Sequence, residues 1–534
     1  MAIYEQLLSK DPLGAFEKIR EDYRRYFETM YRFNINNIPL DQKKNEKLLE
    51  NDNLSKEPYC ELLPKYESKD KDLSGLCAPS IGDYYSFASN IRPLPDSFAD
   101  FINAGLMNYK PYRHQFEMLC KGYGLGHDVL ITSGTGSGKT ESFMLPLLAS
   151  LLDEAQKWSA PSSSYDSSWW KNVDSDGKYN PCQRENETRP SAIRSLLLYP
   201  MNALVADQVG RLRKALDSDE VRLYLDSHCN HNRIFFGSYN GETLKADSSE
   251  TVNRLNTLKV QSERLMLSAQ KGECEPDDIY VTPRLSGSSF TSEMLVREDM
   301  QKTCPDIMIT NISMLSIMLM RCGEQGMLDQ TRAYYEANPN AKFHLVVDEL
   351  HLHRGTSGAE VAYLLRMFLD RIGVPPMKNG KKNPQLQVYT SSASLGSAQT
   401  YLEEFFGIQN PFDIQVGYNL KPEVKPGLPL LNYQLFDCFY LSNAYFKPYY
   451  ELTTTEKDAT EKLFLAKLGY SGTFKDFIND YSSVIYNDLQ GLITSKITTF
   501  PLSAFAKLNG SPSDDAIRGF LIFRGAVDHV NLPN

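Results

Sequence analysis

The sequence contains neither a long hydrophobic run nor a paired cysteine motif. Its most apolar stretch, residues 143–152, is far shorter than the ~20 residues that cross a bilayer, so we expect no membrane partner. The first residues include no basic segment followed by an apolar one, which argues against a signal peptide. The nine cysteines are scattered without a C-x-x-C pair, which favours reduced thiols in a cytoplasmic protein. His228, Cys229 and His231 are close in sequence, but adjacent His and Cys rarely point at one ion, so we expect no metal site there.

An excess of positive charge is also absent. The 57 Lys and Arg residues are outnumbered by 67 Asp and Glu residues, which gives a net charge of −10. This balance argues against a protein whose whole surface grips nucleic acid, but it does not exclude a locally basic groove. The length of 534 residues accommodates about three domains, and the composition is ordinary for a globular protein.

A glycine-rich loop between an apolar strand and a helix is the strongest motif. Residues 129–131 read as a buried strand and residues 141–152 as a helix. The loop between them contains Ser133, Gly134, Thr135, Gly136, Ser137, Gly138, Lys139 and Thr140. Such glycines let backbone N–H groups surround a polyphosphate, so we predict that Lys139 reaches the β- and γ-phosphates and Thr140 ligates Mg²⁺. The alternative is a turn that ends in Lys-Thr by chance, which the flanking strand and helix disfavour.

Three further residues complete a candidate nucleotide site. The apolar run 343–347 is followed by Asp348 and Glu349, which describes a buried parallel strand with carboxylates at its carboxyl end. We predict that Asp348 holds Mg²⁺ and that Glu349 orients or deprotonates the attacking water. The alternative is a pair of acids that caps a helix. Gln115, ahead of the loop, offers an amide donor and acceptor that match an adenine edge.

The remaining pattern predicts an α/β fold with a parallel sheet. Apolar strands are expected at 195–200, 233–237, 307–310 and 385–390, with helices between them, including 202–216 and 314–320. Polar, irregular segments at 153–193 and 244–302 are interpreted as insertions. In the first, Trp169 and Trp170 either stack on bases or clamp the insertion onto the core, and we favour the clamp.

The chain divides, on this pattern, into three regions. Residues 1–95 are expected to be mostly helical, residues 96–410 to form the central lobe, and residues 411–534 to form a mixed α/β accessory domain. Aromatic clusters at 436–440 and 446–450 are interpreted as core, and residues 520–526 as the start of a strand.

Together these motifs resemble the first, RecA-like motor lobe of a superfamily 2 helicase. That family also begins its phosphate loop with a small residue, as Ser133 does here. The resemblance implies ATP and Mg²⁺ as cofactors, Gln115 at the adenine, and Asp348, Glu349, Leu350 and His351 at the hydrolysis site. It also implies that Ser392 and Ser394, in a Ser-Ala-Ser version of the family's Ser-Ala-Thr motif, couple hydrolysis to strand movement.

Four segments make the family resemblance more specific, namely residues 57–66, 199–208, 239–243 and 348–366. They are similar to large bacterial DNA helicases with a C-terminal zinc-binding module, and in particular to the anti-phage helicases of the Druantia type. The family places its nucleic-acid backbone contacts after three strands, which here implies Pro200, Met201, Asn202, Arg211, Gly241, Thr243, Thr310 and Asn311. The alternative is that Asn202 and Thr310 only cap helices, although one residue can do both.

A second motor lobe is the missing part. Its Q-x-x-G-R-x-x-R signature does not occur after Ser394, so we expect an N-terminal piece of a longer protein, weakly active or inactive alone. The resemblance implies a 3′-to-5′ DNA helicase or translocase in defence, with a possible partner protein. The alternatives are an RNA helicase of the same superfamily and a nucleotide-gated scaffold that unwinds nothing.

Overall fold

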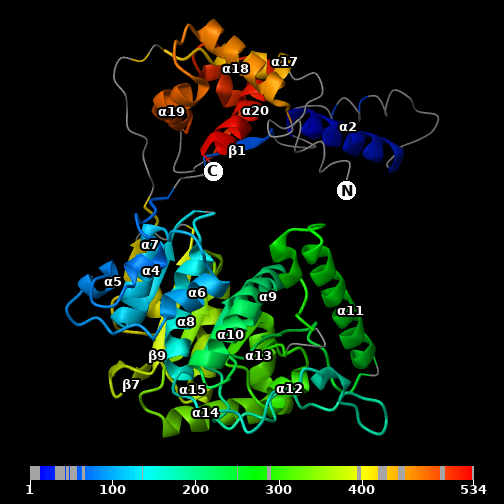
Figure 1. Ribbon diagram of the computed structural model, residues 1–534, viewed down its shortest axis with the longest axis vertical. Helices are drawn as coiled ribbons and strands as arrows, with labels where there is room; N and C mark the ends of the chain where they lie inside the picture. The colour runs from blue at the N-terminus through cyan, green and yellow to red at the C-terminus, as the bar shows by residue number, and fades with distance from the viewer. Residues whose placement is uncertain are drawn as a thin grey trace. The chain divides into compact units, whose positions relative to one another are not determined.

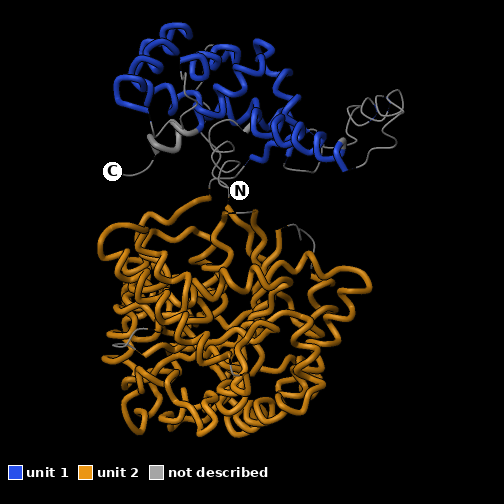
Figure 2. Tube along the Cα trace, turned by 90° about the vertical axis from the view of Figure 1, so that its right-hand side faces the viewer, with its two compact units in different colours: residues 1–64, 420–534 blue, residues 65–419 orange. Residues whose placement is uncertain are grey.

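The computed structural model describes two compact units. Described are residues 12–30, 43, 47, 57–62, 66–134, 136–248, 250–285, 290–393, 399–418, 428, 430–442, 452–493 and 499–531. The larger unit spans Lys65–Asn419, and the smaller unit combines Met1–Pro64 with Leu420–Asn534 (Figure 2). These limits differ from the boundaries expected near residues 95 and 410, because segments distant in sequence pack into one unit. No described helix is both long and apolar enough to cross a bilayer.

The larger unit is built on a seven-stranded sheet in which every pairing is parallel. In spatial order the strands are β10 (Asp413–Val416), β2 (Val129–Thr132), β9 (Leu386–Ser392), β6 (Phe343–Val347), β3 (Ser195–Tyr199), β5 (Ile307–Asn311) and β4 (Phe236–Tyr239). The predicted α/β fold with a parallel sheet is thereby confirmed. β10 was assigned to the accessory region from sequence, and the sheet includes it.

Helices cover this sheet and connect its strands (Figure 1). They are α4 (Leu73–Leu76), α5 (Asp83–Ser86), α6 (Phe98–Gly105), α7 (Arg113–Met118), α8 (Lys139–Ala155), α9 (Asn202–Asp217), α10 (Asp219–His228), α11 (Thr251–Gln270), α12 (Arg297–Lys302), α13 (Ile312–Met320), α14 (Gln325–Ala337), α15 (Gly355–Arg371) and α16 (Gln399–Phe406). A π-helical turn, η1 (Leu119–Gly124), extends α7.

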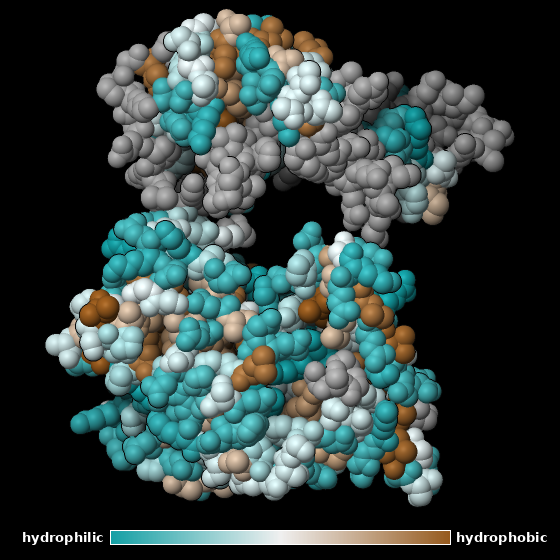
Figure 3. Space-filling model, viewed as in Figure 1, coloured by the Kyte–Doolittle hydropathy of each residue, from teal (hydrophilic) through white to brown (hydrophobic). Residues whose placement is uncertain are grey.

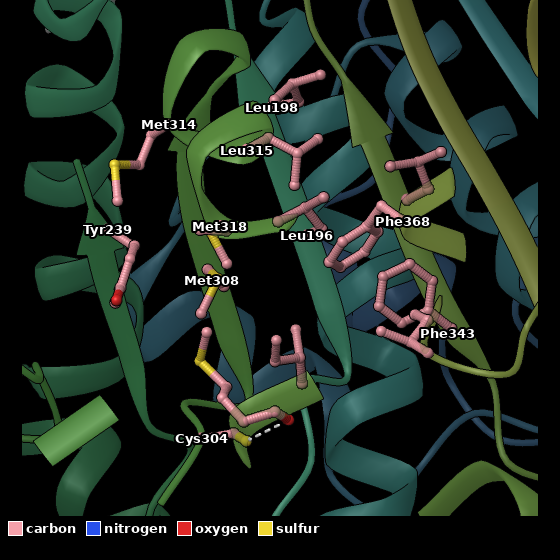
Figure 4. Close-up of a cluster of buried hydrophobic side chains, with 14 of the residues drawn as sticks. Leu196, Leu198, Tyr239, Cys304, Met308, Met314, Leu315, Met318, Phe343 and Phe368 are labelled. Carbon is pink, nitrogen blue, oxygen red and sulfur yellow. Dashed lines mark hydrogen bonds between the residues drawn. The ribbon is translucent and has the colours of Figure 1, made fainter. Parts of the chain in front are cut away.

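The strands are apolar along their length because both sheet faces are buried. Alternate residues of β3 belong to different cores, with Leu196 and Leu198 on one face and Leu197 and Tyr199 on the other. Figure 4 shows the first face, where side chains of α13 and α15 pack on the strands. The outer surface of the larger unit is mostly hydrophilic on the side drawn in Figure 3.

The first predicted insertion, residues 153–193, is fixed to the sheet. Trp169 and Trp170 are each 1% exposed within the core, so they clamp the segment and do not stack on bases. At a second point, the guanidinium of Arg189 forms two 2.7 Å hydrogen bonds to the buried carboxylate of Asp306. The insertion is therefore attached by both apolar packing and a buried ion pair.

The second predicted insertion, residues 244–302, was wrongly described as irregular. It contains the 20-residue helix α11, the short 3₁₀ helix η3 (Pro276–Tyr280) and α12. Of α11, Thr251, Leu255 and Ser262 are buried, so its apolar residues do not form the regular stripe that identifies a helix in sequence.

The smaller unit has its own aromatic core. Its described elements are α2 (Pro12–Met30), β1 (Tyr59–Glu61), η6 (Tyr433–Phe436), α17 (Asp437–Leu441), α18 (Thr454–Leu468), α19 (Phe474–Gly491), β11 (Thr499–Pro501), η8 (Leu502–Lys507) and α20 (Asp514–Asn531). Phe436 and Phe439 are buried in this core, as predicted, whereas the cluster at 446–450 lies outside the described residues. The strand predicted at 520–526 is wrong, because these residues lie inside α20, whose apolar residues pack into the core at helical spacing.

Candidate active site

The parallel sheet gathers the predicted site residues along one edge. All seven strands point the same way, so their carboxyl ends meet there. Thr132 of β2 pairs with Ser392 of β9, and Thr390 of β9 pairs with Val347 of β6. The phosphate loop, the Ser-Ala-Ser segment and the acid pair therefore follow three adjacent strands, and the predicted nucleic-acid residues follow β3, β5 and β4.

The phosphate loop joins β2 to the first turn of α8. Gly136 has φ +72° and Gly138 φ +68°, which are left-handed conformations that suit glycine. At Gly138 a Cβ atom would lie only 2.2 Å from Nε2 of Gln115, so a larger residue would also clash. Thr135 lies outside the described residues. Lys139 opens the 17-residue helix α8, whose N-terminus faces the loop with partial positive charge.

Two residues of α7 brace this loop from behind. The fully buried Gln115 donates from Nε2 to the Gly138 carbonyl at 3.2 Å and accepts from the Tyr112 N–H at 2.8 Å. Nε2 of His114 lies 2.7 Å from the Ser137 carbonyl, and burial lowers the pKa of His114, so the neutral ring donates this bond. His114 was not identified from the sequence, where only its place beside Gln115 marked it. Contact of Gln115 with adenine stays a prediction.

The acid pair lies directly opposite the loop lysine. Nζ of Lys139 is 3.2 Å from Oε1 of Glu349, and both side chains are largely buried. Glu349 has φ +52°, a left-handed conformation that costs a non-glycine residue about 1–3 kcal/mol and that is concentrated at functional sites. Nδ1 of His351 lies 3.1 Å from Oε2 of the same carboxylate, without hydrogen-bond geometry.

Asp348 is the residue at the end of β6 that could hold a hard cation. Burial raises its pKa, the Ser391 hydroxyl opposes this by donating to Oδ1, and the neighbouring Glu349 carboxylate raises it further. The Glu349 N–H also donates to Oδ1, at 3.0 Å. Both of these hydrogen bonds end on Oδ1, and Oδ2 accepts none from the described residues. A free carboxylate oxygen together with the Thr140 hydroxyl fits the oxygen ligands that Mg²⁺ prefers. Ser391 was missed from sequence, although it directly precedes the predicted Ser392.

The other predicted motif positions are partly accounted for. Ser392 is fully buried in β9, and Ser394 lies outside the described residues. Nε2 of Gln208, on α9, lies 3.4 Å from the Thr140 hydroxyl, a contact that no sequence pattern had indicated. No group of three or more His, Cys, Asp or Glu residues that could hold a metal occurs in the described ranges, including around His228 and His231.

The predicted nucleic-acid residues divide into exposed and bracing positions. Asn202 and Gly241 are exposed, and Oδ1 of Asn202 accepts from Nδ2 of Asn311 at 2.6 Å, which ties the ends of β3 and β5. The buried Thr310 and Thr243 instead donate to the carbonyls of Tyr239 and Ser238.

The helix cap in this region is made by Asn311 and not by Asn202 or Thr310. Oδ1 of Asn311 accepts from the Met314 N–H at 2.8 Å and caps α13, while neither Asn202 nor Thr310 makes a side-chain cap. Arg211 is on α9. Its guanidinium pairs with Glu141 of α8 at 2.5 Å and with Asp207 at 3.2 Å, beside the phosphate loop.

Comparison with known proteins identifies related sequences. Residues 112–275 match the DEAD/DEAH box helicase family. Over 428 residues, 72% of the chain, the sequence is 29% identical to the Druantia protein DruE of Escherichia coli (strain UMEA 4076-1), and the alignment covers 20% of that relative. The chain thus spans about a fifth of DruE.

Solved structures give weaker matches. The DUF1998 helicase MrfA bound to DNA and AMPPNP matches with 16% identity and a TM-score of 0.35, over 84% of this chain and 47% of MrfA. The Mycobacterium smegmatis helicase Lhr bound to ssDNA and AMP-PNP matches with 14% identity and a TM-score of 0.35, over 71% of this chain and 37% of Lhr.

Proposed function

We propose that this chain, whose residues 112–275 form a DEAD/DEAH box helicase domain, is the first motor lobe of an ATP-dependent superfamily 2 DNA helicase or translocase. The contact between Lys139 and Glu349, with Asp348 beside them, carries the proposal. Phosphoryl transfer to water needs a cation for the phosphates, a ligand for Mg²⁺ and a carboxylate that positions water. Lys139 follows β2, and Asp348 and Glu349 follow β6. Only β9 lies between these two strands.

The Lys139–Glu349 pair suggests how nucleotide binding prepares hydrolysis. When the loop N–H groups and Lys139 bind the phosphates of ATP, the ammonium group turns from Glu349 toward them. The Glu349 carboxylate is then free to orient water. The left-handed backbone of Glu349, and the hydrogen bond from its N–H to the Ser391 hydroxyl, hold the residue in place. Bound Mg²⁺, held by Asp348 and Thr140, would neutralise developing charge on the phosphate oxygens.

The wider role rests on the relatives. A place in anti-phage defence, 3′-to-5′ polarity and a defence-system partner are further parts of the proposal, as the sequence resemblance to helicases of the Druantia type implies, and the 29% identity to the Druantia protein DruE agrees with that resemblance. DNA is preferred to RNA as the substrate because the sequence resemblance is to DNA helicases. Contacts to the phosphate backbone alone do not distinguish the two sugars.

ATP hydrolysis measured with single-stranded DNA, duplex DNA, RNA or no nucleic acid tests this function. We expect DNA to stimulate turnover by the full-length protein and the 534-residue chain to bind ATP but hydrolyse it slowly. Stimulation by RNA alone would favour the RNA helicase. ATP binding with no response of the full-length protein to any nucleic acid would refute the motor and favour a nucleotide-gated scaffold.

A further inference from the structure

A cleft of about 300 Å³ opens at the carboxyl edge between α9, the loop after β4 and α11. Asn202 and Val205 of α9 line one side, and Arg254 and Leu258 of α11 line the other. Figure 1 shows α11 beside α9 in the larger unit. The second wall therefore comes from the insertion at 244–302, to which no motif assigned a role.

Two of the four charged residues that line this cleft neutralise each other. Nε and Nη2 of Arg213 bind the two carboxylate oxygens of Glu293 at 2.6 and 2.8 Å. Nη1 of Arg213 donates to the carbonyls of Tyr280 and Val281. Arg213 is thus committed to holding η3 and the β4 region together and is not available to a ligand.

Three polar groups around the cleft have no partner among the described residues. The Arg254 guanidinium is exposed and makes no hydrogen bond or ion pair there, and the same holds for the Glu242 carboxylate. Oγ1 of Thr282 is buried and also without a hydrogen-bond partner. A buried hydroxyl without a partner costs free energy, which a bound polar ligand would recover.

The cleft is continuous with the predicted nucleic-acid path. Asn202 and Thr243, two residues implied to follow the strand backbone, line it directly. A nucleic-acid strand that crosses the carboxyl ends of β3 and β4 would therefore pass the opening of the cleft. Among the lining residues described, Arg254 is the one cation free to meet a phosphate, and guanidinium–phosphate bonds are strong and charge-assisted.

We propose that α11 belongs to the nucleic-acid site and that Arg254 binds a backbone phosphate of a single strand lying over this cleft. The inference rests on the proposed function, because it extends the same binding edge. A contact to a backbone phosphate carries no base information, so Arg254 would hold the nucleic-acid strand without reading its sequence.

Binding of a fluorescein-labelled oligothymidylate by the 534-residue chain, followed by anisotropy across a range of salt, tests the proposal. Arg254→Ala should weaken binding about tenfold, as expected for one charge-assisted hydrogen bond, and reduce the salt slope by about 0.7. Arg254→Lys should restore the slope. Glu242→Gln, in the same cleft, should tighten binding because a repulsive charge is removed.

The matched control is Arg264→Ala, on the same helix but not lining the cleft. Arg264 lies about 15 Å along the helix from Arg254, beyond a Debye length of about 10 Å, so its removal should change little. Unchanged affinity in Arg254→Ala, or equal losses in Arg254→Ala and Arg264→Ala, would overturn the assignment while the motor function stands. A wild-type chain that binds ATP but no oligonucleotide would refute both.

Discussion

Replacement of Gln115 by alanine distinguishes two roles for this residue. Its amide connects the Tyr112 N–H to the Gly138 carbonyl, both inside the protein. The mutation leaves the half-buried Tyr112 N–H without a partner, whereas the Gly138 carbonyl keeps the N–H and the hydroxyl of Ser142, so we expect about 1–3 kcal/mol less stability. If about 2 kcal/mol of this acts on the loop conformation, nucleotide affinity falls about 30-fold.

The assay compares ATP with tripolyphosphate, which carries phosphates but no base. A residue that only braces the loop should weaken both ligands by the same factor, measured by titration calorimetry. The matched control is Gln156→Ala at the far end of α8, whose amide also bridges two backbone groups, those of Asp96. Because the hydrogen bonds of Gln156 to Asp96 are solvent-exposed, this variant should lose less stability than Gln115→Ala and bind both ligands normally. Loss of ATP binding with unchanged tripolyphosphate binding would refute the bracing argument and assign Gln115 to adenine.

Four further predictions concern the nucleotide site and the first insertion. Lys139→Ala should abolish tight ATP binding in calorimetry, and normal affinity would remove the phosphate-loop assignment. Glu349→Gln should bind ATP but lower turnover at least about 100-fold, and wild-type turnover would exclude Glu349 from the chemistry. Because burial raises the pKa of Asp348, its ionised form is lost at a higher pH than for an ordinary Asp, so Mg²⁺-dependent turnover should decline as pH falls through that raised value; the acid limb should lie above about pH 4 when measured well below saturating Mg²⁺, because bound Mg²⁺ favours the ionised carboxylate. Trp170→Ala should cost about 3–5 kcal/mol in thermal unfolding, whereas unchanged stability with lost nucleic-acid affinity would revive base stacking.

The central strands could be predicted because parallel strands buried on both faces read as continuous apolar runs. The run 343–347 matches β6 at both ends, and the loop after β2 is marked by glycines that its backbone conformation requires. β10 carries only alternating apolar residues at the sheet edge, where little burial is available to mark it. The pairing of β1 with β11 joins the two ends of the chain, and no local pattern encodes such a contact.

The site was predictable in its chemistry but not in its supports. Lys139, Asp348 and Glu349 stand out because their residue types follow strands in a fixed order, and the sheet brings them together. Their bracing partners, His114 and Ser391, are ordinary buried polar residues whose role depends on geometry that only the fold creates. For the same reason the ion pairs of Arg211 with Glu141 and Asp207 could not be read from the sequence, and its contact with nucleic acid stays a prediction.

Helix α9 gives a physical connection between the two halves of this edge. It begins at Asn202, which bonds Asn311 at the strand-binding side, and it reaches Thr140 and Glu141 through Gln208 and Arg211. These contacts lie about 9–14 Å apart along one continuous helix, and a helix transmits displacement without a flexible joint. If α8 moves when Lys139 turns from Glu349 to phosphate, these contacts therefore either resist the movement or move α9 with it. We infer that coupling between the nucleotide and the predicted nucleic-acid residues would pass through both the Gln208–Thr140 contact and the Arg211–Glu141 pair.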